Sequence, residues 1–307
     1  MKKIIISGVA LLALSTLTAQ QDAMYTHYAF NTLAVNPGYA GSRDALTITG
    51  LHRSQWVGFD GAPVTQTLTL HTPLMSDKLG IGMSIVNDRI GPMNVTSFYA
   101  DFAYKIKVSE KGKLAFGVKG GANLVQGNLS SLNTDQPNDV AFAQNIQSSF
   151  LPNFGFGMYY YTSKWYVGVS TPKLLENDFN SSNIQNAKEE RHYFLIAGTV
   201  FNLSEGGKVK FKPTTFVKVT EAAPIQGDLT GMFIFQDKLE IGAMYRSGDA
   251  AGLLLGYNFS PQLRFGYAYD FSFTNRTFTY NGGSHEVMLR YDFVYADKGR
   301  IRSPRYF

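Results

Sequence analysis

Two short runs in the sequence could take part in catalysis, but neither completes a catalytic pattern. Gly168-Val169-Ser170-Thr171-Pro172 begins like the nucleophile turn of a serine hydrolase and lacks its last glycine. His285-Glu286 begins like a zinc-protease helix, but Leu289 occupies the place of the second histidine. Both runs also lie in segments that alternate with the period of a strand, which is the wrong context for either reaction.

A lipid hydrolase in a membrane would need a serine and a histidine on the same face. Ser284 and His285 are adjacent, and neighbours in a strand point to opposite faces, so they cannot pair within one strand. The chain has no cysteine, which excludes disulfides and thiolate metal sites. We therefore predict a protein that is not an enzyme and has no cofactor, and lipase assays would test this.

One polar stretch supplies several oxygen ligands of the kind that calcium prefers. Its candidate residues are Asn133, Asp135, Asn138 and Asp139. They lack the full pattern of a calcium-binding loop, so we expect a solvated external loop without metal. Calcium that raised the melting temperature of the purified protein would contradict this expectation.

The dominant period in the chain is two, which is typical of strands. In residues 79–86, Leu79, Ile81 and Met83 alternate with Gly80, Gly82 and Ser84. A soluble sandwich would bury the bulky side chains, whereas here the opposite face is small or polar. This favours a barrel whose bulky face meets lipid and whose small or polar face meets the lumen. Gly80 and Gly82 are then barrel glycines and not part of a dinucleotide loop.

Counting such runs predicts an all-β fold, a transmembrane antiparallel β-barrel of about 14 strands after a cleaved signal peptide. Most runs are near the ~9–11 residues that a tilted strand needs to cross a bilayer. An even count places the two ends of the barrel on one side. The predicted strands are 44–56, 63–72, 79–90, 93–108, 113–126, 153–161, 165–171, 191–203, 209–220, 225–235, 239–246, 250–259, 262–273 and 284–294.

The connections between these strands give an independent check. Bacterial barrels have short periplasmic turns and longer external loops. With a periplasmic N-terminus, the three longest connections, 127–152, 172–190 and 274–283, all fall on the external side. The predicted periplasmic turns are all brief: 73–78, 109–112, 162–164, 204–208, 236–238 and 260–261. A strand assigned in error would have broken this agreement.

The N-terminus reads as a secretory signal over residues 1–19. Lys2 and Lys3 precede an apolar run from Ile4 to Leu14, and small residues follow up to Ala19. A signal-anchor is the alternative, but the run is shorter than the ~20 residues of a membrane-spanning helix. Residues 20–43 alternate poorly and are expected as a lumen plug or a periplasmic segment. The barrel then covers 44–294 and a basic periplasmic tail covers 295–307.

Composition and charge agree with a barrel and argue against nucleic-acid binding. Aromatic residues reach 14% and charged residues only 17%, below the ~25% of an ordinary globular chain. Without Lys2 and Lys3 the chain holds 26 basic and 23 acidic residues. The tail alone contributes four basic residues, Lys298, Arg300, Arg302 and Arg305, against Asp297. The remainder is near neutral and offers no broad basic face for phosphates.

Charged residues of both signs are predicted on the lumen side of the strands. They are Arg53, Asp101, Lys105, Lys119, Asp228, Glu240, Arg246, Arg264, Asp270, Glu286, Arg290 and Asp292. A paired network that fills the barrel is one interpretation, and a selective pore lining is the other. Rings of one sign would favour a pore, so the mixture favours the network. Trp56, Trp165 and the tyrosines are interpreted as girdles at the membrane interfaces.

Several motifs together resemble a known family. The first are Asn36-Pro37-Gly38-Tyr39-Ala40-Gly41 and the run from Arg53 to Pro63, RSQWVGFDGAP. The others are Asn87-Asp88-Arg89-Ile90-Gly91-Pro92, Leu151-Pro152-Asn153-Phe154-Gly155, Tyr267-Ala268-Tyr269-Asp270-Phe271, Ser284-His285-Glu286-Val287 and Ser303-Pro304-Arg305-Tyr306-Phe307. The chain resembles the PorP/SprF family of type IX secretion system outer-membrane proteins over essentially its whole mature length. Gly38 stands where alanine is expected, which is a minor departure.

The resemblance implies a role in type IX secretion or gliding motility in the outer membrane of a diderm, Bacteroidota-type bacterium. It implies a non-catalytic barrel that assists export or surface attachment of a secreted adhesin or other cargo. Periplasmic or lipoprotein components of the machinery and outer-membrane lipid are the further partners, with both termini periplasmic. The alternative is an outer-membrane channel or a pore similar to fatty-acid transporters, which bilayer conductance would distinguish.

Candidate partner-binding residues come from the family motifs and from the basic tail. They are Asn36, Pro37, Tyr39, Arg53, Trp56, Arg300, Arg302, Arg305, Tyr306 and Phe307. The external loops 127–152 and 172–190 are long and polar and suit a partner at the cell surface. An assembly signal with a disordered end is the alternative interpretation of the tail. Deleting 298–307 should spare the barrel and weaken partner capture.

Overall fold

The fold is that of a computed structural model, and it describes residues 23–74, 78–131, 145–178, 189–221, 223–273 and 281–293. The predicted signal peptide, the loop that carries Asn133 and Asp135, and the basic tail lie outside these ranges. None of the described helices is long and apolar enough to span a membrane.

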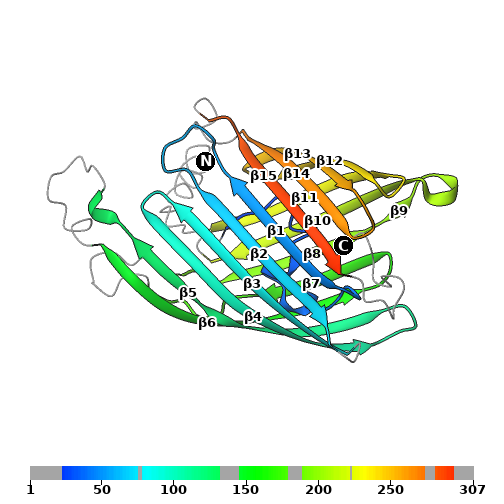
Figure 1. The fold of residues 1–307 in the computed structure, drawn as a ribbon, viewed down its shortest axis with the longest axis horizontal. Helices are drawn as coiled ribbons and strands as arrows, with labels where there is room; N and C mark the ends of the chain where they lie inside the picture. Colours follow the sequence, from blue (N-terminus) through cyan, green and yellow to red (C-terminus); the bar gives the residue numbers. More distant parts are fainter. Residues whose placement is uncertain are drawn as a thin grey trace, which may run out of the picture.

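Fourteen antiparallel strands form one closed barrel, as the sequence predicts, and a short fifteenth segment extends one of them. The first strand, β1, pairs with the last, β15, so the sheet has no seam, and the two lie side by side in Figure 1. The strands are β1 Leu46–Ser54, β2 Val64–Pro73, β3 Leu79–Ile90, β4 Met93–Lys107, β5 Lys113–Gly127, β6 Ile146–Tyr161, β7 Trp165–Thr171, β8 His192–Thr199, β9 Phe201–Asn202, β10 Val209–Thr220, β11 Ala223–Phe235, β12 Leu239–Arg246, β13 Ala250–Asn258, β14 Leu263–Ser272 and β15 Ser284–Phe293.

Two predicted strands differ from the structure. Strand β6 begins at Ile146, well before the predicted 153, because it continues to pair with β5 up to Gly127. The connection predicted as 127–152 therefore shortens to 128–145. The strand predicted as 191–203 is divided into β8 and β9 at Val200, whose backbone amide donates to Lys164 O at 2.9 Å across the neighbouring turn.

The connections divide the barrel into two ends, here called the turn end and the loop end. The turn end holds the connections 74–78, 108–112, 162–164, 203–208, 236–238 and 259–262. The loop end holds 55–63, 91–92, 128–145, 172–191, 221–222, 247–249 and 273–283. Strand β1 begins and β15 ends at the turn end, as an even strand count requires. The long connections share the loop end, which agrees with the predicted parity.

Bulky apolar side chains point outward and small or polar ones point inward. Strand β12 alternates strictly between exposed and buried residues from Leu239 to Arg246. Leu253 on β13 is 64% exposed, whereas its neighbour Leu254 is 1% exposed. The exposed apolar set continues around the wall, as the band that a membrane barrel presents to lipid. This outward face is therefore the one that contacts membrane lipid.

Residues 23–43, here called the plug, lie inside the barrel. The plug contains one turn of α-helix, α2 Thr32–Val35, and a 3₁₀ turn, η2 Pro37–Tyr39. The Tyr25 hydroxyl lies 3.0 Å from Thr67 Oγ1 toward the loop end, and Gly41 N donates to His71 Nδ1 at 3.2 Å toward the turn end. The plug therefore runs the length of the lumen before β1 begins, and Figure 1 shows it in dark blue within the ring of strands.

Candidate functional site: a plugged lumen

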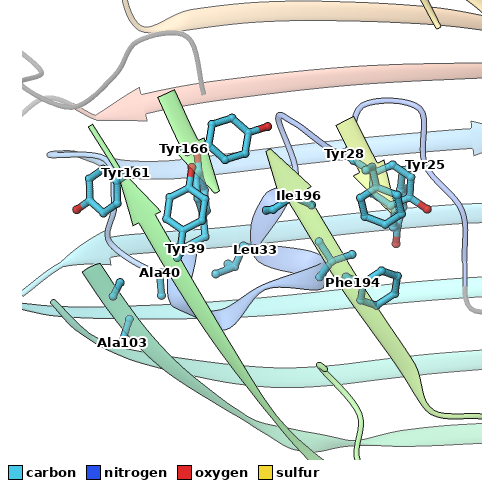
Figure 2. Close-up of a cluster of buried hydrophobic side chains, with 14 of the residues drawn as sticks. Tyr25, Tyr28, Leu33, Tyr39, Ala40, Ala103, Tyr161, Tyr166, Phe194 and Ile196 are labelled. Atoms are coloured by element: carbon cyan, nitrogen blue, oxygen red, sulfur yellow. The ribbon is translucent and has the colours of Figure 1, made fainter. Parts of the chain in front are cut away.

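Aromatic side chains of the plug pack against aromatic side chains of the wall. Tyr28 stacks on Phe216 of β10 with ring centroids 3.7 Å apart, and Tyr39 meets Tyr159 of β6 edge-on at 5.4 Å. Leu33 is 1% exposed in the same cluster. Figure 2 shows Leu33 and Tyr39 surrounded by side chains from several strands. Such contacts remove apolar area from water on both partners, at roughly 25 cal/mol per Å².

Glycines of the wall let the plug backbone approach the strands closely. A Cβ on Gly80 of β3 would clash with the backbone oxygen of Ala40, and one on Gly117 of β5 would clash with the backbone at Pro37 and Gly38. Any other residue at these two positions would push the plug away from the wall. The period-two glycines thus have a specific task, which is to seat the plug.

Asn36 fixes the middle of the plug with both ends of its amide. Its Oδ1 accepts from Gly38 N at 2.9 Å, which caps η2, and its Nδ2 donates to Met158 O of β6 at 3.0 Å. Nearby, Ser170 of β7 donates to Val35 O at 2.8 Å. The backbone of this irregular segment is therefore held by the wall, as a buried segment without a sheet partner requires.

Near the loop end the plug is held by ionisable groups, here called the loop-end network: His27, Arg53, Asp228, Arg246, Asp270 and Glu286. Glu286 of β15 accepts from Thr26 N at 2.8 Å, from His27 N at 2.7 Å, and lies 2.7 Å from His27 Nδ1. It also faces Arg53 Nη1 at 3.3 Å. The Glu286 carboxylate therefore links the plug to β15 and, through Arg53, links β15 to β1.

The other carboxylates of this network have guanidinium partners. Asp270 lies 2.8 Å from Arg53 Nη2 and accepts from Thr26 Oγ1 at 2.6 Å. Asp228 receives Arg246 Nε at 3.0 Å and Nη2 at 2.8 Å, and Arg246 also donates to Tyr25 O at 2.9 Å. Each charged group here has a partner within about 3 Å, so the network closes the lumen as a structure.

At the other end lie Arg43, Lys212, Glu240, Arg264, Arg290 and Asp292, here called the turn-end cluster. Arg43 donates to Asp292 through Nη2 at 2.8 Å and Nε at 3.2 Å, and Arg264 pairs with Glu240 at 2.6 Å. Phe30 of the plug lies under cations, with Lys212 Nζ at 3.7 Å and the Arg264 guanidinium carbon at 3.6 Å from its ring centroid. These contacts seat the plug from the turn end.

The predicted lumen charges all lie inside the barrel. Each of the twelve, from Arg53 to Asp292, is at most 6% exposed. His27 and Arg43 were not predicted, because both precede the first strand, where no periodicity marks a face. Lys212, which is 0% exposed, was not predicted either, although Lys210 and Lys212 stand two residues apart in β10 and therefore share a face.

The structure separates the candidate partner-binding residues into three groups. Asn36, Pro37, Tyr39 and Arg53 are buried in the lumen, so their contacts are with the barrel itself. Trp56 lies at the loop end, is partly buried, has a positive φ of 45°, and donates its backbone N–H to Ser284 Oγ at 3.3 Å. The third group, Arg300, Arg302, Arg305, Tyr306 and Phe307, lies outside the described residues.

The two catalytic fragments occupy positions that fit a barrel wall. Ser284 is 5% exposed, whereas His285 is on the other face with its Nδ1 2.7 Å from the Tyr267 hydroxyl. Ser170 donates to the plug. Within the described ranges, no three acidic or histidine side chains converge as metal ligands. Asn133, Asp135, Asn138 and Asp139 fall outside those ranges.

Solved structures with a similar trace are outer-membrane barrels. The Acinetobacter baumannii outer membrane protein Omp33 matches at 10% identity with a TM-score of 0.48, covering 83% of this chain and 100% of Omp33. The CymD monoaromatic hydrocarbon channel matches at 13% identity with a TM-score of 0.48, covering 86% and 93%. A Pseudomonas aeruginosa FadL homologue matches at 12% identity with a TM-score of 0.47, covering 87% and 94%.

The family comparison covers most of the chain. No curated protein sequence matches it significantly. The family model described as type IX secretion system membrane protein PorP/SprF matches residues 17–291, which include the plug and nearly all of the barrel. The chain therefore belongs to the PorP/SprF family of type IX secretion system membrane proteins.

Proposed function

We propose that this barrel is a non-catalytic component of the type IX secretion and gliding machinery in a Bacteroidota-type outer membrane. In this role it assists the export or the surface attachment of a secreted adhesin. Its family supports a place in that machinery, and its lipid-facing wall supports a membrane site. The charged side chains of the loop-end network are used to hold the plug.

One observation carries this proposal, which is that the plug is fixed to the wall at both ends. Opening the lumen would break the contacts of Glu286 with the plug near the loop end and those around Phe30 near the turn end. A passive channel needs a continuous aqueous path, whereas a barrel that presents or anchors a partner does not. The plug therefore favours the partner role over the channel alternative.

The two ends of the barrel suggest its orientation. Short connections are typical of the periplasmic side, so we place the turn end in the periplasm and the loop end outside. In this orientation Phe293, the last residue of β15, faces the periplasm. Strand β1 begins at the same end, whereas Tyr25 of the plug lies toward the loop end. That both termini are periplasmic stays a prediction.

Planar-bilayer conductance would test the plugged state. The purified mature protein should be nearly silent, and a variant that lacks residues 23–41 should conduct, because that deletion empties the lumen without removing a strand. Steady conductance by the unaltered protein, at the level of the deletion variant, would support the channel alternative.

Partner capture is tested separately. Affinity purification from native membranes, with mass spectrometry of the bound proteins, should recover a secreted adhesin and a periplasmic component. A variant without residues 298–307 should form the barrel but recover less of the periplasmic component. If that variant captures partners and supports secretion normally, the proposed role of the basic tail is wrong.

A further inference from the structure

A pocket of about 250 Å³ opens at the turn end of the lumen. Its mouth is formed by the turns 236–238 and 259–262, and its inner wall includes Arg43, Arg264 and Arg290. The plug ends beside it, since Arg43 is the last plug residue. The pocket is therefore continuous with the turn-end cluster and has room for a group of a few heavy atoms.

The charges around this pocket do not balance. The turn-end cluster holds four basic residues, Arg43, Lys212, Arg264 and Arg290, and two carboxylates, Glu240 and Asp292, which leaves a formal excess of two positive charges. The pocket is also lined by Lys238 and by Asp237, and Asp237 pairs with Lys210, so these residues do not reduce the excess. Both carboxylates are already engaged: Asp292 accepts from Arg43 and from Thr47 Oγ1 at 2.7 Å, and Glu240 pairs with Arg264. Neither is available to compensate Arg290 fully.

Arg290 is the group that points to a ligand. Its side chain is 4% exposed, and its Nε and Nη1 have no hydrogen-bond acceptor among the described residues. In the part of the chain that the structure describes, its nearest carboxylate is Asp292, with Nε 4.0 Å from Oδ2, and its guanidinium carbon lies 5.8 Å from the centroid of the Phe30 ring. Arg264 Nε on the same pocket wall is also without an acceptor. Buried guanidinium donors are normally satisfied, so an acceptor belongs here.

We propose that this pocket binds a small oxyanion of the phosphate or carboxylate class, with Arg290 as its main ligand and Arg264 beside it. The planar fork of an arginine side chain matches two oxygens of such a group. The excess positive charge lies where water is largely displaced, which strengthens the attraction. A cation would meet repulsion from the same four basic side chains. This site is independent of the proposed secretion role.

Thermal unfolding of the intact mature protein in a non-ionic detergent tests the site. Inorganic phosphate is the probe, and sodium chloride at equal ionic strength is the reference. We expect phosphate at about 100 times its dissociation constant to raise the melting temperature by about 2–5 °C. Acetate in a parallel titration shows whether a free carboxylate binds as well as phosphate. No rise beyond the chloride reference with either anion would overturn the proposal.

Variants separate binding from general salt effects, because phosphate also stabilises proteins by exclusion from their surface. Arg290→Gln should abolish the specific rise. Lys105→Gln is the matched control: it also removes a buried lumen cation, one that donates to Gly41 O at 2.7 Å and does not line the pocket. The control should keep the full rise. An equal rise in Arg290→Gln and in the unaltered protein would overturn the proposal.

A second variant keeps the test decisive if Arg290→Gln does not fold. Arg290→Lys retains the charge but loses the fork, so phosphate should bind roughly tenfold more weakly than to the unaltered protein. Isothermal titration calorimetry with phosphate measures this directly. If phosphate binds to Arg290→Lys and to Arg264→Gln with unchanged affinity, it binds elsewhere and the proposal is wrong.

Discussion

The two ends of the lumen use the same kinds of side chain in opposite ways. In the loop-end network, two arginines and a histidine face three carboxylates, and each charged group has a partner within about 3 Å. In the turn-end cluster, four cations face two carboxylates, and within the described ranges Arg290 has no carboxylate oxygen nearer than 4.0 Å. The loop-end network leaves Arg53 Nε and Asp270 Oδ1 without a hydrogen bond, but each of its groups has a close ion-pair partner. In the turn-end cluster, Arg290 has no such partner among the described residues, and it lies beside a pocket.

This difference shows why counting charges in a barrel does not reveal their task. Desolvating an ion is costly, and partners with good geometry are needed to offset that cost. The loop-end network meets this requirement through hydrogen bonds from the plug backbone at Thr26 and His27. The turn-end cluster meets this requirement only in part, because Arg290 lacks a close partner among the described residues. Plug retention is thus assigned mainly to the loop end, and ligand binding to the turn end.

The largest expected effect contrasts two arginines. Arg246→Gln should destabilise the protein by about 3–5 kcal/mol, because it leaves Asp228 buried without its charge partner. Arg290→Gln should change stability by less than about 1 kcal/mol or increase it, because no close partner is lost. Reversible denaturant unfolding in micelles measures both. Equal losses would remove the distinction between the two ends.

A smaller effect is expected where the plug touches the wall. Gly117→Ala should cost about 1–3 kcal/mol and raise bilayer conductance, because the new methyl group meets the backbone at Pro37 and Gly38. Gly120→Ala on the same strand is the matched control, since a Cβ there meets no atom within 4 Å. If both variants behave like the unaltered protein, the plug is looser than the close approach implies.

The smallest effect tests a single neutral hydrogen bond near the loop end. Thr67→Val should cost about 1 kcal/mol, because the buried Tyr25 hydroxyl loses its partner at 3.0 Å while the side-chain volume is kept. Limited proteolysis near the start of the plug should rise only slightly. A loss as large as that of Arg246→Gln would mean that the neutral contact, and not the ion network, retains the plug.

A control on chemistry belongs with this series. Ser284→Ala should leave stability within about 1 kcal/mol, since its hydroxyl accepts only a long bond from Trp56 N at 3.3 Å. If the unaltered protein hydrolysed lipid esters and this variant did not, the proposed non-catalytic role would be wrong.

The strands were predictable because every second residue of a barrel strand faces lipid, which gives the sequence a hydrophobic period of two. Leu79, Ile81 and Met83 must face outward, so Gly80 and Gly82 must face inward, whatever the rest of the chain does. The long start of β6 was missed because Pro152 and Asn153 interrupt that period. The lumen position of the twelve charged residues, from Arg53 to Asp292, followed from the same alternation.

The sequence by itself determined the closed barrel, its strand order and the inward face of Arg53, Glu286 and Arg290, because each follows from local alternation and chain direction. Only the tertiary structure decided which charges meet. The plug has no period, so nothing local places Thr26 and His27 at Glu286 or Phe30 under Lys212. Those contacts join segments more than 180 residues apart, and their geometry exists only once the ring of strands has closed.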